Sequence, residues 1–127
     1  MSLRSPLGRA VGHGSAKDGV SHWWVQRLTA LALVPLTLWF LLALLGLPAL
    51  DYPSVHSWIG EGWNPVFIVL LVLALAWHSA LGVQVVIEDY VHGKPIKIAS
   101  LLASTFVHLG LAAAGVYAVL KIAFTGL

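Results

Sequence analysis

Three long stretches without a single Asp, Glu, Lys or Arg constrain this chain more than any other feature. They cover residues 28–50, 62–87 and 98–120, and each reaches the roughly 20 residues that a helix needs to cross about 30 Å of hydrocarbon. One such run could be a buried helix of a soluble protein, but three in succession favour a membrane. We predict an all-α integral membrane bundle of three transmembrane helices, at about 27–48, 64–88 and 98–121.

Length and composition limit what else the chain can contain. Of 127 residues, 59% are hydrophobic and 9% charged, whereas soluble domains carry about 25% charged residues. We expect one membrane-anchor domain over residues 1–127, too short to hold a soluble catalytic domain as well, so that larger chemistry comes from partner chains. The absence of cysteine excludes disulfides and iron–sulfur ligation by this chain. The net charge of +2 rests on few residues, and we expect no nucleic-acid partner.

The basic residues predict an orientation in the membrane. Four precede the first apolar stretch and two separate the second from the third: Arg4, Arg9, Lys17, Arg27, Lys94 and Lys97. Residues 51–61 contain neither Lys nor Arg, and only Lys121 departs from the pattern. By the positive-inside rule the N-terminal segment faces inward. In a bacterial inner membrane the N-terminus is then cytoplasmic and the C-terminus periplasmic; the mitochondrial inner membrane is the alternative location.

Two histidines, His78 and His108, fall well inside the predicted spans. An ionisable residue within a membrane indicates a functional site, because it is costly to bury without a partner. The alternative is a neutral histidine that hydrogen-bonds a neighbouring helix. Around His78, the small residues Ala74 and Gly82 lie four positions to either side, on the same helical face. They would leave room for a macrocycle whose iron the imidazole ligates, although small residues also permit close helix packing.

Asp89 follows His78 by eleven residues, about three helical turns, and so projects from nearly the same face roughly 16 Å nearer the inner surface. Tyr90 is its neighbour. A phenol can donate a hydrogen bond to a quinone carbonyl, and a carboxylate can orient a donor or relay a proton. The alternative is an interfacial tyrosine beside a water-facing carboxylate.

The sequence of residues 78–93, HSALGVQVVIEDYVHG, resembles the second-helix motif of the succinate dehydrogenase hydrophobic membrane anchor subunit. Residues 14–30 contain GSAKDG, then HWW, then QRLTA, and resemble the approach to the first helix of the same family. Length and number of spans agree with this family, so the resemblance covers most of the chain. The third stretch contributes little beyond hydrophobicity.

The resemblance implies a membrane anchor of succinate:ubiquinone oxidoreductase, respiratory complex II, that does not oxidise succinate itself. It implies that His78 is one axial ligand of haem b and that a second membrane anchor, of the cytochrome b type, supplies the other. Arg27 would lie near a haem propionate, Tyr90 would hydrogen-bond ubiquinone, and Asp89 would support that site. A flavoprotein subunit and an iron–sulfur subunit are the implied soluble partners. Glu88 departs from the family pattern, in which Thr is common at this position.

Two other functions fit the residues taken alone. His78 and His108 each lie about ten or eleven residues, roughly 15 Å, from the inner boundary. A self-contained small cytochrome b that uses both as ligands is therefore geometrically allowed. The second alternative is a non-redox packing subunit in which both histidines hydrogen-bond within the bundle.

Overall fold

A computed structural model describes residues 17–125. Outside this range lie Arg4 and Arg9, which contributed to the predicted orientation. Residues 14–16, which contributed to the family resemblance, also lie outside it. All four elements of the described part are helices: α2 (Lys17–Leu45), α3 (Tyr52–Gly60), α4 (Asn64–Tyr90) and α5 (Lys94–Thr125). Within residues 17–125 there is no strand.

Three of the helices are long and apolar enough to cross a membrane: Val20–Leu45, Asn64–Tyr90 and Lys94–Thr125, with 26, 27 and 32 residues. The predicted all-α membrane architecture with three spans is therefore confirmed. The limits of the hydrocarbon region along each helix, the single domain and the inward-facing N-terminus stay predictions.

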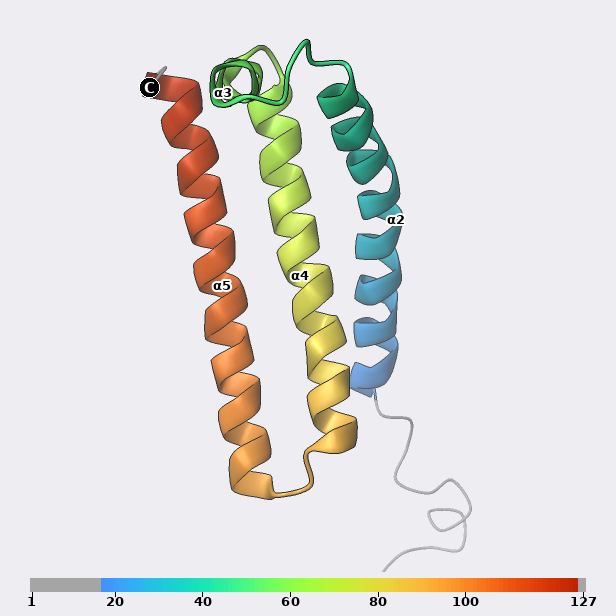
Figure 1. The fold of residues 1–127 in the computed structure, drawn as a ribbon. Helices are drawn as coiled ribbons and strands as arrows, with labels where there is room; N and C mark the ends of the chain where they lie inside the picture. The colour runs from blue at the N-terminus through green and yellow to red at the C-terminus, as the bar shows by residue number, and fades with distance from the viewer. Residues whose placement is uncertain (1–16, 126–127) are drawn as a thin grey trace, which may run out of the picture.

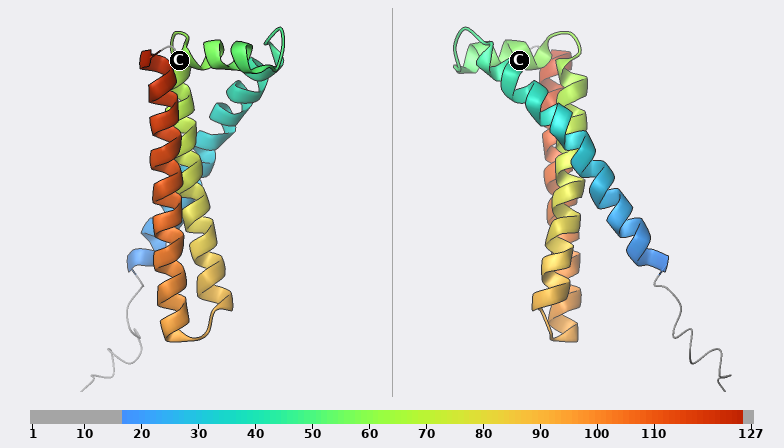
Figure 2. Two further views of the ribbon diagram at one scale, coloured as in Figure 1. Left: turned by 60° about the vertical axis from the view of Figure 1, so that its left-hand side comes forward. Right: turned by 90° about the vertical axis from the view of Figure 1, so that its right-hand side faces the viewer.

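Helix α4 is the centre of the arrangement. Helices α2 and α5 both pack against α4, one on each side (Figure 1). Figure 2 shows that α2 crosses the α4–α5 pair obliquely, so that its first and its last turns both diverge from the pair. The described helices thus form an open arrangement in which α2 and α5 each pack on α4, and they do not form a closed bundle.

The short helix α3 lies across one end of this arrangement (Figures 1 and 2). Asp51 caps its N-terminus by accepting a hydrogen bond of 3.0 Å from the Ser54 backbone N–H. Hydrogen bonding with Ser54, through its side chain and its backbone, lowers the pKa of Asp51 from the ordinary value of 3.8. At the other end of α3, Gly62 takes a φ of 56° in the turn into α4, a conformation that favours glycine.

An aromatic cluster joins α3 to the diverging end of α2 and to α4. Trp39 stacks on Trp58 with ring centroids 5.8 Å apart and contacts Phe67 at 5.0 Å, while Phe40 packs 5.8 Å from Trp58. Such pairs contribute about 0.5–1.5 kcal/mol each beyond area burial. The cluster holds α2 to the rest of the protein where their backbones separate.

A second fixed point is the turn between α4 and α5. The Lys97 ammonium group donates a hydrogen bond of 2.7 Å to the backbone carbonyl of Glu88. This carbonyl belongs to the last turn of α4, where helical C=O groups lack intrahelical partners and a cation is favourable. The bond fixes the α4–α5 hairpin at the end of the molecule where α2 begins (Figure 1).

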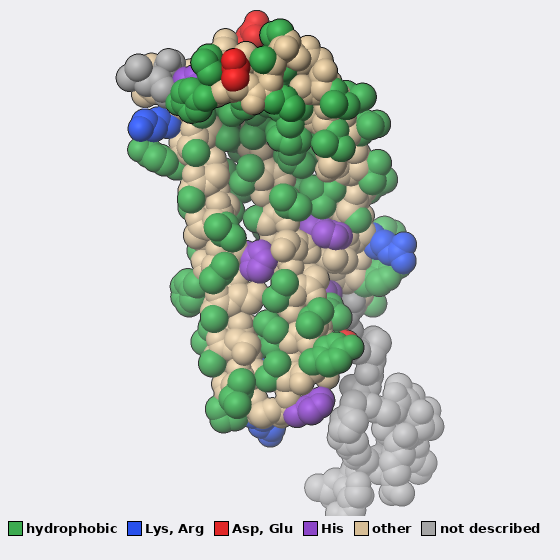
Figure 3. Space-filling view, in the orientation of Figure 1, with side chains coloured by type: hydrophobic (Ala, Val, Ile, Leu, Met, Phe, Trp, Pro, Cys, Tyr) green, Lys and Arg blue, Asp and Glu red, His purple; other side chains and the backbone are tan. Residues whose placement is uncertain are grey.

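Almost none of the described side chains is enclosed. Only Ile68 and Val119 are buried, each 7% exposed, whereas large apolar residues such as Leu31 and Phe106 are about 70% exposed. Hydrophobic side chains are spread over the whole visible face between the two ends, with backbone and small polar side chains between them (Figure 3). This surface suits lipid and other membrane subunits, not water.

Close packing of α4 on α5 depends on Gly115. A Cβ atom added there would lie 3.0 Å from Cγ1 of Val72, closer than carbon atoms normally approach. At Gly110, one and a half turns earlier on α5, an added Cβ would meet nothing within 4 Å. The two glycines therefore separate the effect of helix propensity from the effect of helix contact.

We predict that Gly115→Val destabilises the protein by about 1–3 kcal/mol through overpacking against Val72, and that the matched control Gly110→Val does not. The measurement is the thermal midpoint of the purified protein in detergent. Equal midpoints for the two variants would contradict the contact between Gly115 and Val72 as a packing constraint.

Candidate functional site

His78 lies half-buried near the middle of α4 and faces α2. Its Nδ1 atom is 3.0 Å from the hydroxyl oxygen of Thr29, and its Nε2 atom is 3.4 Å from the amide nitrogen of Gln26. Both partners are on α2, three residues and so about one turn apart. The imidazole is therefore held between two helices of the same chain and does not point freely into lipid.

The surroundings of His78 leave space on one side. A Cβ atom added at Gly82, on the same face of α4, would meet nothing within 4 Å. Ala74, four residues before the histidine, presents only a methyl group. The donor set and this free space fit a flat porphyrin whose iron takes one imidazole ligand from this chain. A ligating histidine normally donates its other ring N–H to a protein acceptor, and Thr29 stands where that acceptor is needed.

In the sequence, Arg27 lies between Gln26 and Thr29, the two residues of α2 that contact His78. It is therefore within about one helical turn of that contact. Its side chain is exposed, and its guanidinium carbon lies 5.0 Å from the centre of the Trp23 ring. An exposed cation at the predicted start of a membrane span can reach the headgroups or pair with an anion. The position suits a pairing with a carboxylate brought by a bound group.

His108 is satisfied in a different way. Its Nδ1 is 2.7 Å from the backbone carbonyl of Ser104, to which it donates, and its Nε2 is 3.0 Å from the hydroxyl of Ser79 on α4. This is the arrangement expected for a neutral histidine that hydrogen-bonds a neighbouring helix. The structure does not bring His108 and His78 together, since one bonds to α4 and the other to α2.

Asp89 and Tyr90 form the exposed C-terminal end of α4, and Tyr90 is 79% exposed. Glu88 beside them is engaged: its carboxylate accepts a hydrogen bond of 2.8 Å from the Gln84 amide, and its carbonyl accepts the bond from Lys97. Asp89 and Tyr90 are thus open to a ligand or to a neighbouring subunit at the end of the helix.

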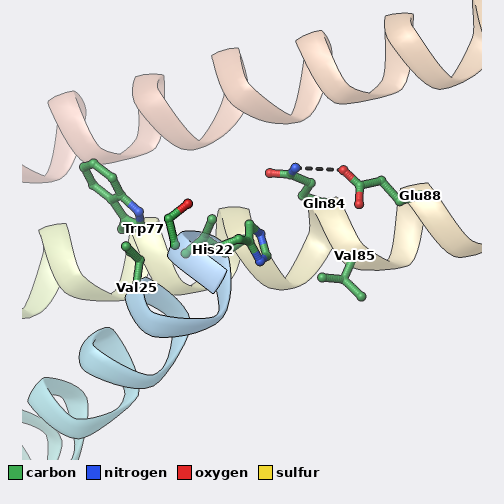
Figure 4. A pocket seen from close by; sticks show the side chains of 8 residues that line it. His22, Val25, Trp77, Gln84, Val85 and Glu88 are labelled. Carbon is green, nitrogen blue, oxygen red and sulfur yellow. Dashed lines mark hydrogen bonds between the residues drawn. The ribbon is translucent and has the colours of Figure 1, made fainter. Parts of the chain in front are cut away.

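A crevice of about 520 Å³ opens between the first turns of α2 and the last turns of α4. His22 stands on the α2 side, and Gln84 and Glu88 stand on the α4 side (Figure 4). The Nε2 atom of His22 is buried and has no hydrogen-bond partner in the described part of the chain. Neither Asp89 nor Tyr90 lines this crevice, so it is separate from the predicted quinone contacts.

A larger groove of about 630 Å³ lies between α4 and α5, with His108 and Ser104 in its wall. Trp77, Leu81 and Gln84 line both this groove and the crevice at α2. Within residues 17–125, no three His, Asp or Glu side chains gather as they would around a metal ion. A metal bound through His78 would need ligands from outside the described residues.

Sequence comparison decides the family. The family model described as succinate dehydrogenase/fumarate reductase transmembrane subunit matches residues 1–119. The chain belongs to this family. The succinate dehydrogenase membrane anchor subunit of Reclinomonas americana is 35% identical over 88 residues, which are 67% of this chain and 73% of that protein.

Two bacterial relatives extend the match along the chain. Both are named succinate dehydrogenase hydrophobic membrane anchor subunit. That of Rickettsia bellii is 33% identical over 80% of this chain and 81% of its own length, and that of Paracoccus denitrificans is 28% identical over 95% and 93%. The resemblance inferred from residues 78–93 is confirmed, and the chain is a multi-pass membrane anchor subunit of this family.

Sequence reasoning missed the partners of His78. In the sequence, Gln26 and Thr29 belong to the motif that resembles the family, and nothing in that motif indicates that they contact His78. Their spacing was the available signal, since two polar residues three positions apart in an apolar helix share one face. What the sequence could not supply is the register that brings this face opposite the imidazole.

Proposed function

We propose that this chain is the hydrophobic anchor of a succinate:ubiquinone oxidoreductase, in which it supplies one axial ligand of haem b and part of the ubiquinone-reduction site. The observation that carries the proposal is the His78 imidazole, held at mid-span by two side chains of α2 with open space beside it at Gly82. The Asp89–Tyr90 pair at the end of the same helix supports the second part.

Each residue has a distinct role in this proposal. His78 would hold the haem iron together with a residue of a second membrane anchor of the cytochrome b type. Arg27 neutralises a propionate. Bound haem supplies a one-electron carrier within the membrane. Tyr90 donates a hydrogen bond to a ubiquinone carbonyl, and Asp89 orients the donors around it.

The chemistry on succinate belongs to other subunits. A flavoprotein subunit oxidises the dicarboxylate and an iron–sulfur subunit carries the electrons to the membrane, where this chain anchors both. These 127 residues contain no cysteine that could ligate an iron–sulfur cluster, which supports a division of labour of this kind.

We further propose a bacterial inner membrane, with the start of α2 and the α4–α5 turn on the cytoplasmic side. Lys94 and Lys97 stand at this turn, whereas α3 at the opposite end is flanked by Asp51 and Glu61. Short inward-facing loops carry an excess of basic residues, and this distribution supports the proposed orientation.

We predict that His78→Ala abolishes or alters the b-type optical spectrum of the purified complex, because the iron loses a ligand. His108→Ala is the matched control, since His108 already bonds to Ser104 and Ser79, and it should keep the spectrum. Reduced-minus-oxidised difference spectra measure both. Loss of low-spin haem in His108→Ala would favour a self-contained bis-histidine cytochrome.

We predict that Tyr90→Phe lowers quinone reductase activity about 2- to 13-fold, the equivalent of one hydrogen bond of about 0.5–1.5 kcal/mol. Succinate oxidation by a soluble artificial acceptor should stay unchanged, because it does not use the quinone site. Tyr117→Phe, at an exposed tyrosine on α5, controls for loss of a phenol elsewhere. Full quinone activity in Tyr90→Phe would rule out an essential hydroxyl.

The natural absence of cysteine makes the orientation directly measurable. We predict that Ser57→Cys on α3 reacts with a membrane-impermeant maleimide in intact spheroplasts, and that Gly93→Cys in the α4–α5 turn reacts only after the membrane is opened. Mass spectrometry of the chain reports the labelling. The reverse pattern would place the N-terminus on the periplasmic side.

A further inference from the structure

The Thr29 hydroxyl has three polar neighbours and only one proton. Its oxygen lies 2.9 Å from the Val25 carbonyl, 3.1 Å from the Gln26 carbonyl and 3.0 Å from Nδ1 of His78. A carbonyl oxygen can only accept. The hydroxyl proton therefore points back along α2, as in the common bond of a helical threonine to a carbonyl four residues earlier.

This arrangement decides which nitrogen of His78 carries the proton. With its own proton directed at a carbonyl, the Thr29 oxygen is an acceptor toward the ring, so Nδ1 must be the protonated donor. In a neutral imidazole the other nitrogen then bears the free lone pair. The hydrogen-bond network thus assigns the Nδ1–H form and leaves Nε2 as the atom able to bind iron.

Gln26 stands in front of that lone pair. Its amide nitrogen is 3.4 Å from Nε2, a long contact, while its own Oε1 is buried without a hydrogen-bond partner among residues 17–125. An unpaired buried carbonyl is unfavourable, because it has lost its hydrogen bonds to water. The Gln26 amide therefore covers Nε2 of His78 while its own carbonyl oxygen lacks a hydrogen bond. We expect an amide held in this way to move aside readily.

We propose that α2 prepares His78 as an iron ligand: Thr29 is a positioning residue that fixes the Nδ1–H form, and Gln26 is a movable cover over Nε2. The inference rests on the proposed haem role of His78. The ligand that displaces the cover is an iron porphyrin, to which Nε2 donates its lone pair.

His108 shows why the cover matters. It also carries its proton on Nδ1, which donates to the Ser104 carbonyl, but its Nε2 accepts from the Ser79 hydroxyl at 3.0 Å. That hydroxyl makes a normal hydrogen bond and leaves no buried group unpaired in exchange. The two histidines therefore differ at Nε2. In His78 the Nε2 lone pair faces a long contact with an amide that has an unpaired carbonyl, whereas in His108 it accepts a normal hydrogen bond.

The first test is the protonation of His78 in the full-length chain in detergent, without haem. Nitrogen NMR of chain labelled at its histidine nitrogens reports which ring nitrogen is protonated, and the resonances absent from His78→Ala identify the residue. We expect protonated Nδ1 in the wild type, Thr29→Ser and Gln26→Leu. In Thr29→Val, which removes the acceptor at nearly constant volume, we expect the proton to shift to Nε2.

The second test is haem retention in the assembled complex. Loss of a hydrogen-bond partner to a ligating histidine typically weakens metal binding 10- to 100-fold. We expect a loss of about that size in Thr29→Val, rescue by Thr29→Ser, and no loss in Gln26→Leu or in the control Thr37→Val on the exposed side of α2. The measurement is haem content after dilution, together with the haem midpoint potential.

The outcomes separate this inference from the proposed function. An unchanged proton position in Thr29→Val, or failure of Thr29→Ser to rescue, would overturn the positioning role of Thr29. Haem loss in Gln26→Leu would overturn the movable cover. If the protonation results hold but His78→Ala keeps its haem spectrum, the hydrogen-bond assignment stands and the proposed haem role fails.

Discussion

The contact of every long helix with α4 is the constraint on which the rest of the structure depends. Helices α2 and α5 both pack against α4, and within the described residues only Ile68 and Val119 are enclosed. There is consequently little hydrophobic core of the kind that stabilises a soluble protein. Each helix satisfies its own backbone hydrogen bonds, as a lipid environment demands, and specific contacts set how the helices lie. Gly115 on Val72, the Trp39 cluster and the α2 contacts of His78 are contacts of this kind.

Because both other long helices pack against α4, the direction in which each α4 side chain points determines what it can contact. At about 100° per residue, Asp89 lies roughly 20° from His78 around the helix, and Gly82 about 40° from it. Trp77, Leu81 and Glu88 occupy another face, which opens into the crevice at α2. Tyr90, twelve residues after His78, points about 120° away from it. One helix can therefore turn the proposed iron ligand, the proposed quinone donor and the crevice toward different neighbours.

The sequence was sufficient for the parts of this fold that depend on local chemistry. Uninterrupted apolar stretches predicted the three spans because length and hydrophobicity alone decide whether a helix can cross a membrane. The intramembrane position of His78 followed from counting residues. Its partners did not, because the register of α2 against α4 depends on packing between segments some fifty positions apart. The same holds for His108, whose two bonds could not be distinguished in sequence from an open ligand position.

Charge placement explains why the chain is incomplete alone. Arg27 is adjacent in sequence to Gln26, which contacts His78, yet its side chain is exposed on the outer surface of α2 and stacks on Trp23. A permanently charged guanidinium at the predicted start of a membrane span requires a counter-charge, water or a path to the headgroups. In the nearby His78 imidazole, Nε2 faces the Gln26 amide across a long contact of 3.4 Å. The proposed haem, a flat iron-containing dianion held against a second membrane subunit, would satisfy both residues at once.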